Sequence, residues 1–123
     1  MHRSRIGVVL IDHGQSAFEA SLAFWRGATG RESTAEGEFQ SLGDCGGFFL
    51  ALQRLGAGTP SRVHLDIETD DVVAETARLV ALGAKVVEKR AGYAILREPG
   101  GLPFCVVPVQ TGDLFTQHAT TWE

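Results

Sequence analysis

The 123-residue sequence has no long apolar run, no cluster of basic residues and no closely spaced pair of cysteines. No stretch approaches the roughly 20 apolar residues that a membrane-spanning helix needs. The formal net charge is −4, which argues against a surface for nucleic acid or anionic membranes, because such surfaces are basic. We therefore expect a protein with no nucleic-acid partner and no membrane partner.

Only two cysteines are present, Cys45 and Cys105, and they lie far apart in the sequence. They fit no Cys-x-x-Cys spacing. The first apolar run of the chain is short and ends at Asp12, so a signal peptide is not expected. Reduced thiols and a cytoplasmic location are the expectation that follows.

The clearest local pattern lies at residues 62–69, where the sequence RVHLDIET alternates between two kinds of side chain. Its apolar members are Val63, Leu65 and Ile67. Its polar members, which can titrate or ligate, are His64, Asp66 and Glu68. Because successive side chains on a strand point to opposite faces, one face should pack on a core and the other should carry polar chemistry. A strand with water on its outer face would give the same alternation, and that interpretation stays open.

The order strand, helix, strand, strand, strand is predicted twice along the chain. The first set consists of a strand at 6–11, a helix that Ser16 and Glu19 begin as a capping box, two short strands within 31–42 and a strand within 46–55. The second set consists of a strand at 62–68, a helix that Thr69 or Asp70 caps and Gly83 ends, and strands at 85–88, 92–97 and 103–109. One such unit could hardly bury its sheet face alone, so the two should pair within the chain or across a dimer.

These boundaries predict a single domain at 1–123. Its first module covers about 5–55, its glycine-rich linker 56–61 and its second module 62–109. The polar tail at 110–123 is expected to be loose, with Phe115 and Trp122 as candidate docking points.

Two stretches, RVHLDIETDDVVAETARLVALGAKVV and YAILREPGGLPFCVV, resemble the second half of the glyoxalase/bleomycin-resistance/extradiol-dioxygenase superfamily, also called vicinal oxygen chelate. The first half is similar but looser, in IGVVLID, in Phe24-Trp25 and in FFLALQRL. The likeness is closest to the glyoxalase-like subgroup and covers residues 5–109. It implies an α+β fold of two paired βαβββ modules, whose mostly antiparallel mixed sheet forms a cup with the helices on its outer face. It also implies a homodimer, since members of the superfamily commonly form dimers.

The resemblance further implies a set of metal ligands, which this sequence matches poorly. The first-strand position falls on Gly7, which cannot ligate, and a position in the first module falls near Ala51. His64 occupies the first-strand position of the second module, and Cys105 occupies a last-strand position that is normally Glu. Because a site of three or four hard donors is not reached, we predict no metal cofactor. A metal site completed by Asp66 or by a partner chain is the alternative.

Strand parity predicts which side chains line the implied cup. The candidate ligand-binding residues are Trp25, Phe49, Gln53, His64, Asp66, Tyr93, Arg97 and Cys105. This lining is mostly apolar or aromatic with a few convergent polar groups, as a small-molecule site requires. His64 and Asp66 are also the candidate catalytic acid and base, because histidine titrates near neutral pH and a carboxylate would orient it.

Each candidate has a structural alternative. The His64–Asp66 pair could be a buried contact that fixes the two modules in register. Cys105 and Trp25 could be core residues, and Arg97 could be an exposed strand end.

The sequence thus favours a metal-free protein that binds a small apolar or aromatic molecule in the cup. The alternatives are a lyase or isomerase that uses His64 and Asp66, a metal-dependent glyoxalase-like or dioxygenase-like enzyme, and a structural module with a filled cup. A fold shared by many chemistries does not decide among them.

Overall fold

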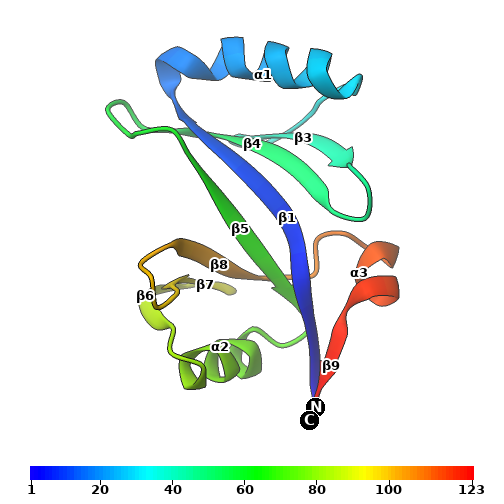
Figure 1. The fold of residues 1–123 in the computed structure, drawn as a ribbon, viewed down its shortest axis with the longest axis vertical. Coiled ribbons are helices and arrows are strands. Elements are labelled where there is room, and N and C mark those ends of the chain that lie inside the picture. Colours follow the sequence, from blue (N-terminus) through cyan, green and yellow to red (C-terminus); the bar gives the residue numbers. More distant parts are fainter. The chain divides into compact units, whose positions relative to one another are not determined.

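The computed structural model describes all 123 residues, which form nine strands and three helices (Figure 1). The chain divides into two compact units. Unit 1 consists of Met1–Val8 and His64–Glu123, and unit 2 consists of Val9–Val63. The long strand β1 (His2–Gly14) therefore contributes its first part to unit 1 and its second part to unit 2. None of the helices is long and apolar enough to cross a membrane.

Unit 2 is built from one helix and an antiparallel set of three strands, together with the end of β1. The elements are α1 (Gln15–Thr29), β2 (Thr34–Glu36), β3 (Phe39–Asp44) and β4 (Phe49–Leu55). Strand β3 lies between β2 and β4. Leu50 and Leu52 of β4 pack against Phe18 and Leu22 of α1, which confirms the predicted parity of β4. The helix thus covers one face of these strands (Figure 1).

The start of α1 differs from the prediction of a capping box. The N-cap residue is Gly14, and no side chain caps the helix. Ser16 lies inside the first turn, and the Glu19 carboxylate instead accepts from Arg54 Nη2 of β4 at 2.7 Å. The Glu19 side chain lies on the surface of α1, and from there it reaches Arg54 of β4. Gly30 ends α1 in the left-handed conformation at φ 68°, which glycine adopts readily.

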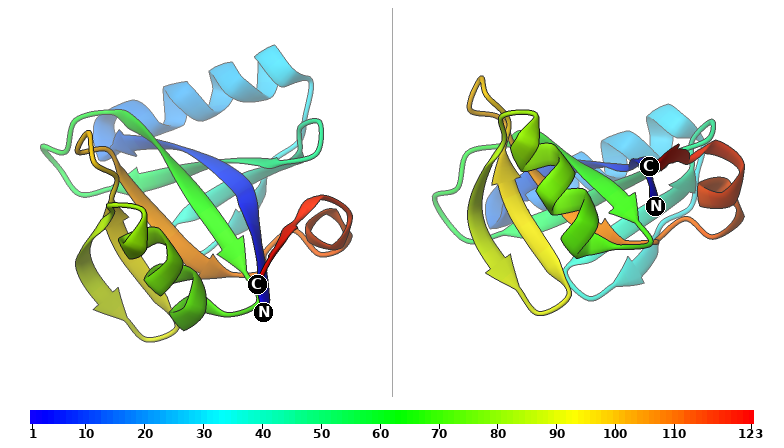
Figure 2. Two further views of the ribbon diagram at one scale, coloured as in Figure 1. Left: turned by 60° about the horizontal axis from the view of Figure 1, so that its bottom comes forward. Right: turned by 90° about the horizontal axis from the view of Figure 1, so that it is seen from below.

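Unit 1 contains the second set of elements and the end of the chain. These are β5 (Arg62–Thr69, from His64 on), α2 (Val72–Ala81), β6 (Lys85–Arg90), β7 (Tyr93–Arg97), β8 (Pro103–Pro108), α3 (Asp113–His118) and β9 (Thr120–Trp122). The hydrogen-bonding order is β5-β8-β7-β6, with β5 and β8 parallel and the other pairs antiparallel. Helix α2 lies along these strands and contacts β7 and β8 (Figure 2).

The core of unit 1 lies between α2 and one face of its strands. Its buried members are Ala84, Ala94, Leu96, Phe104 and Val106. Leu65 and Ile67 of β5 pack against them, as the alternation in the sequence predicted. Asp71, rather than Thr69 or Asp70, caps α2, and its side chain accepts from Ala74 N at 3.0 Å.

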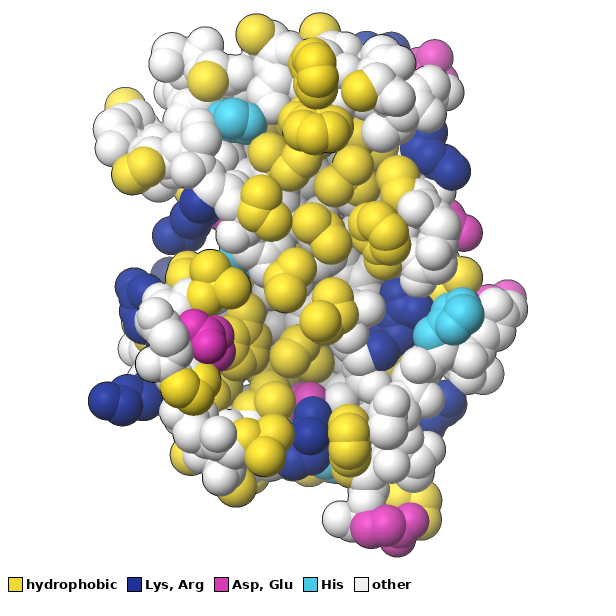
Figure 3. Space-filling view, viewed as in Figure 1, with side chains coloured by type: hydrophobic (Ala, Val, Ile, Leu, Met, Phe, Trp, Pro, Cys, Tyr) yellow, Lys and Arg dark blue, Asp and Glu magenta, His cyan; other side chains and the backbone are white.

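Apolar side chains also reach the surface of each unit. Phe24 of α1 is 63% exposed and Val73 of α2 is 80% exposed. The space-filling view shows exposed hydrophobic side chains over the strands as well as near the helices (Figure 3). Exposure of apolar side chains is usual for proteins and does not by itself mark a site.

The C-terminal segment is ordered, in contrast to the expectation of a loose tail. Strand β9 pairs antiparallel with the start of β1, so that Trp122 lies opposite His2. Phe115 of α3 is buried, and the Arg3 guanidinium lies 5.4 Å from the centre of its ring. Phe115 and Trp122, the two expected docking residues, therefore hold this segment against the rest of unit 1. The sequence at 110–123 is short and polar, so its local pattern did not predict an ordered segment.

A buried carboxylate joins the two ends of the chain to α2. Glu75 of α2 accepts from Ser4 Oγ and lies against His2 Nε2, both at 2.7 Å, and forms an ion pair with Arg78 at 2.8 Å. The Arg78 guanidinium stacks 3.8 Å from the centre of the Trp122 ring. Burial alone would raise the pKa of Glu75, but hydrogen bonds from Arg78, His2 and Ser4 outweigh it and hold the pKa below its ordinary value.

We expect Glu75→Gln to lower the free energy of unfolding by about 1–3 kcal/mol at neutral pH. Because the pKa of Glu75 is lower in the folded protein, its contribution is complete above the unfolded pKa and is lost as the pH falls through the folded value. The difference between the two proteins, measured by urea unfolding, should therefore shrink as the pH falls below about 4. Glu32→Gln, which removes an exposed partner of Arg26, is the control and should change little. A difference that stays constant down to pH 3 would contradict the role assigned to Glu75.

Candidate functional site

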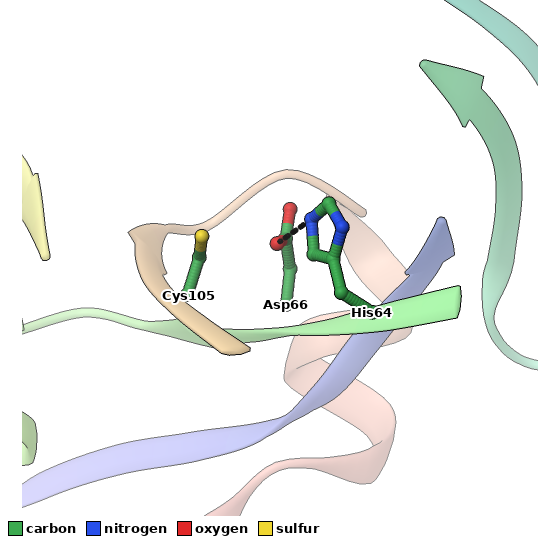
Figure 4. Close-up of side chains that lie close together, drawn as sticks. All are labelled: His64, Asp66 and Cys105. Atoms are coloured by element: carbon green, nitrogen blue, oxygen red, sulfur yellow. Dashed lines mark ion pairs between the residues drawn. The ribbon is translucent and has the colours of Figure 1, made fainter. Parts of the chain in front are cut away.

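The polar face of β5 carries a cluster of three side chains with different chemistry. His64 and Asp66 come from β5 and Cys105 comes from β8 (Figure 4). His64 Nε2 lies 3.5 Å from Asp66 Oδ1. One ligand atom from each of the three residues lies within 4.8 Å of the others. His64 and Asp66 are only 8% and 7% exposed, whereas Cys105 is half-buried.

Strand pairing explains why these three residues meet. His64 and Asp66 are two positions apart on β5, so their side chains share a face. The parallel register places Cys105 of β8 opposite Asp66, and the antiparallel register places Ile95 of β7 opposite Cys105. Alternate residues on these strands pack against α2, so the cluster lies on the face of the strands that points away from α2.

The surroundings of the cluster on this face are mainly apolar. Ile95 lies beside Cys105, and Val107 of β8 is buried two positions further along. Tyr93 lies two positions before Ile95 on β7 and is half-buried. The arrangement is a small polar group within an apolar sheet face, and it can donate, accept and exchange protons or ligate a cation.

Glu68 was predicted to share this face, but its carboxylate is committed to other donors. It accepts from the backbone N–H groups of Gln110 and Thr111, at 2.7 and 3.0 Å, and from the Thr111 hydroxyl. Arg5 Nε of β1 lies 3.0 Å from the same carboxylate. Glu68 is fully buried. It therefore connects β5 to β1 and to the C-terminal segment, and its oxygens are occupied by this network.

The Glu68 side chain occupies the space beside Gly7, so position 7 has to be a residue without a side chain. A Cβ at position 7 would lie 2.7 Å from Glu68 Cγ and would overlap the carboxyl group more closely still. The backbone of Gly7 has no unusual torsion that would demand glycine. The position that the superfamily resemblance assigns to a first-strand ligand therefore has neither a donor nor the space for one.

The remaining predicted residues stay outside the cluster. Arg97 is exposed, and its Nη1 donates to the Gly101 carbonyl in the turn after β7 at 2.7 Å. Trp25 packs on the core of unit 2 and forms an edge-to-face contact with Phe24, with ring centres 5.0 Å apart. The two candidates on β4, Phe49 and Gln53, are half-buried in unit 2. A ligand-binding role for Trp25, Phe49, Gln53, Tyr93 and Arg97 remains a prediction.

The ligand set implied by the resemblance does not fit the residues present. Gly7 offers no donor, and Ala51 is an alanine buried in unit 2. Of that set only His64 and Cys105 can ligate. The carboxylate that converges with them is Asp66, which lies outside the implied set.

The sequence profile of the glyoxalase-like domain matches residues 8–107. The chain belongs to the glyoxalase-like domain family. The resemblance seen in the sequence is thereby confirmed. A search of curated proteins finds no match.

Solved structures show the same fold at low sequence identity. One is the NAD-dependent benzaldehyde dehydrogenase from Legionella pneumophila, with a TM-score of 0.62, 9% identity, and coverage of 83% of this chain and 99% of that chain. Another is a mutant 4-hydroxymandelate synthase from Streptomyces coelicolor, with a TM-score of 0.61, 14% identity, and coverage of 89% of this chain and half (50%) of that chain. A third is the methylmalonyl-CoA epimerase from Streptomyces coelicolor, with a TM-score of 0.52, 20% identity, and coverage of 88% and 97%. The predicted α+β fold class of this superfamily is confirmed.

We expect Gly7→Ala to lower the free energy of unfolding by about 1–3 kcal/mol, because the new methyl group overlaps the Glu68 side chain. In a Glu68→Ala background the same change should cost less than about 0.5 kcal/mol, since the obstructing side chain is gone. Urea unfolding of the four proteins measures the coupling. Gly27→Ala in α1 is the control, because a Cβ there meets nothing within 4 Å, and it should be neutral or slightly stabilising. Equal costs of Gly7→Ala in both backgrounds would show that Glu68 does not determine the residue at position 7.

Proposed function

We propose that the protein binds a small molecule on the face of unit 1 that carries His64, Asp66 and Cys105. The observation that supports this most directly is the convergence of an imidazole, a carboxylate and a thiol within 4.8 Å. The neighbouring Ile95 and Val107 would contact an apolar or aromatic part of the molecule. Small-molecule sites typically combine such an apolar lining with a few convergent polar groups.

A comparison of the buried carboxylates of unit 1 supports the same choice of site. Glu68 and Glu75 each receive several strong hydrogen bonds, so their burial is explained by structure alone. Asp66 approaches His64 only to 3.5 Å, which is longer than the roughly 2.7–2.9 Å of a charge-assisted hydrogen bond. A ligand group placed beside Asp66 would supply the short hydrogen bond that this carboxylate lacks.

Native mass spectrometry of the purified protein tests this proposal. The same spectra give the number of subunits in the assembly, and we propose a homodimer. We expect an organic molecule to accompany the protein and to be lost, or bound about tenfold more weakly, in His64→Gln and Asp66→Asn, because each change removes a polar contact. His118→Gln, at an exposed position of α3, is the matched control and should retain the molecule. Equal retention by His64→Gln would place the binding site elsewhere.

Proton transfer is a second candidate function, favoured by the position of the Asp66 carboxylate next to the His64 imidazole. A carboxylate in this place can orient the ring and stabilise its protonated form. The substrate would then be a compound with an exchangeable proton next to a carbonyl group.

We expect such an activity to appear as deuterium incorporation into small carbonyl compounds in D₂O, followed by proton NMR. His64→Gln should abolish the exchange because it removes the imidazole that would carry the proton, and Asp66→Asn should slow it. His118→Gln should leave it unchanged. Exchange that persists in His64→Gln would exclude this residue as the acid or base.

A further inference from the structure

The three side chains of the cluster offer one donor atom of each kind, an imidazole nitrogen, a carboxylate oxygen and a thiol sulfur. Nitrogen and thiolate donors suit zinc-type cations, whereas Mg²⁺, Ca²⁺ and Mn²⁺ are bound mainly by oxygen ligands. The nearest further carboxylate on β5, that of Glu68, is committed to Arg5 and Thr111. Gly7 supplies nothing. Unit 1 thus presents a mixed set of three donors and no ring of oxygens at this place.

The geometry of the cluster matches part of a tetrahedral site. Bonds of about 2.0–2.1 Å to nitrogen and oxygen and about 2.3 Å to sulfur place neighbouring ligand atoms about 3.3–3.6 Å apart. The 3.5 Å between His64 Nε2 and Asp66 Oδ1 equals such an edge. One ligand atom of each of the three residues lies within 4.8 Å of the others, so the Cys105 sulfur would reach such a spacing by a movement on the order of 1 Å, which a side-chain torsion can supply.

We infer that His64, Asp66 and Cys105 form a binding site for one thiophilic divalent cation of the zinc type, in preference to a hard cation such as Mg²⁺ or Mn²⁺. The inference rests on the proposed function, because it assigns the cation to the same face as the small molecule. It departs from the expectation of metal-free binding, which counted only the donors at His64 and Cys105 and left Asp66 as an alternative.

The number of protein donors also indicates which kind of small molecule this site would bind. Structural zinc sites are closed by four protein ligands, whereas sites with three keep a position for water or a ligand. The cluster has three donors, and the side chains beside it, Ile95 and Val107, cannot ligate. The small molecule is therefore expected to combine an oxygen or sulfur donor with an apolar body.

The test uses the full-length protein, freed of metal by a chelator and titrated separately with Zn²⁺, Co²⁺, Mg²⁺ and Mn²⁺. We expect one Zn²⁺ or Co²⁺ per chain by native mass spectrometry, a near-ultraviolet thiolate-to-cobalt absorption band, and no saturable binding of Mg²⁺. Cys105→Ser should abolish the band and weaken Zn²⁺ binding at least about tenfold, and Asp66→Asn should weaken it as well. Cys45→Ser, which removes the other free cysteine, is the matched control and should change neither.

A second measurement needs no variant and so does not depend on how a variant folds. Zn²⁺ should protect Cys105, and not Cys45, from alkylation by iodoacetamide, as read by peptide mass spectrometry. Alkylation of Cys105 at the same rate with and without Zn²⁺, a cobalt band that survives in Cys105→Ser, or binding of Mn²⁺ as tight as that of Zn²⁺ would each overturn the inference.

The two proposals fail in different ways. An organic molecule that depends on His64 and accompanies a protein unable to bind Zn²⁺ would overturn the cation site and leave the proposed function standing. Zn²⁺ bound at Cys105 in a protein that retains no organic molecule would support the cation site and count against the proposed function.

Discussion

The parallel pairing of β5 with β8 is the constraint on which the candidate site depends. Its register places Cys105 opposite Asp66 and Phe104 opposite Leu65. The second of these pairs belongs to the core that packs against α2, so the core and the polar cluster are set by the same register. A shift of one residue would turn Cys105 toward the helix and bring Phe104 to the polar face. The free energy of burying Phe104, Leu96 and Val106 against α2 therefore also holds the cluster in place.

The buried carboxylates of unit 1 are of two kinds. Glu68 and Glu75 are fully buried, and each is surrounded by donors from segments far apart in the sequence. Such groups are costly to bury without partners, so these networks fix β1, α2 and the C-terminal segment relative to β5 within the unit. The Asp66 carboxylate instead lies 3.5 Å from the His64 ring and near the Cys105 thiol. Glu68 and Glu75 are therefore structural residues, because their hydrogen bonds hold segments together. Asp66 lies beside a histidine and is a candidate functional residue.

The sequence predicted most of the strands, because alternation and glycine punctuation are local signals. It also predicted that His64, Asp66 and Cys105 share a face, since parity follows from each strand separately. It could not predict their distances, which depend on the register between β5 and β8. Local signals misled where tertiary contacts decided the outcome: Glu19 pairs with Arg54 instead of completing a capping box, and Trp122 stacks with Arg78 instead of remaining in a loose tail. The partners of Glu68 were missed for the same reason, because Arg5 and Thr111 are more than 40 positions away along the chain in either direction.

Gly7 and Glu68 together explain how this chain departs from the ligand pattern implied by its superfamily. A ligating side chain at position 7 would have to occupy the space that Glu68 fills, so the two arrangements exclude each other. Once Glu68 is held there by Arg5 and Thr111, β1 can contribute no donor at this position, and the chemistry of unit 1 is left to β5 and β8. On those strands Cys105 stands where the resemblance implies a carboxylate, and Asp66 supplies a carboxylate from another position. The donors are thus fewer and softer than in the implied set, and the loss of the donor on β1 follows from the packing of Glu68 against Gly7.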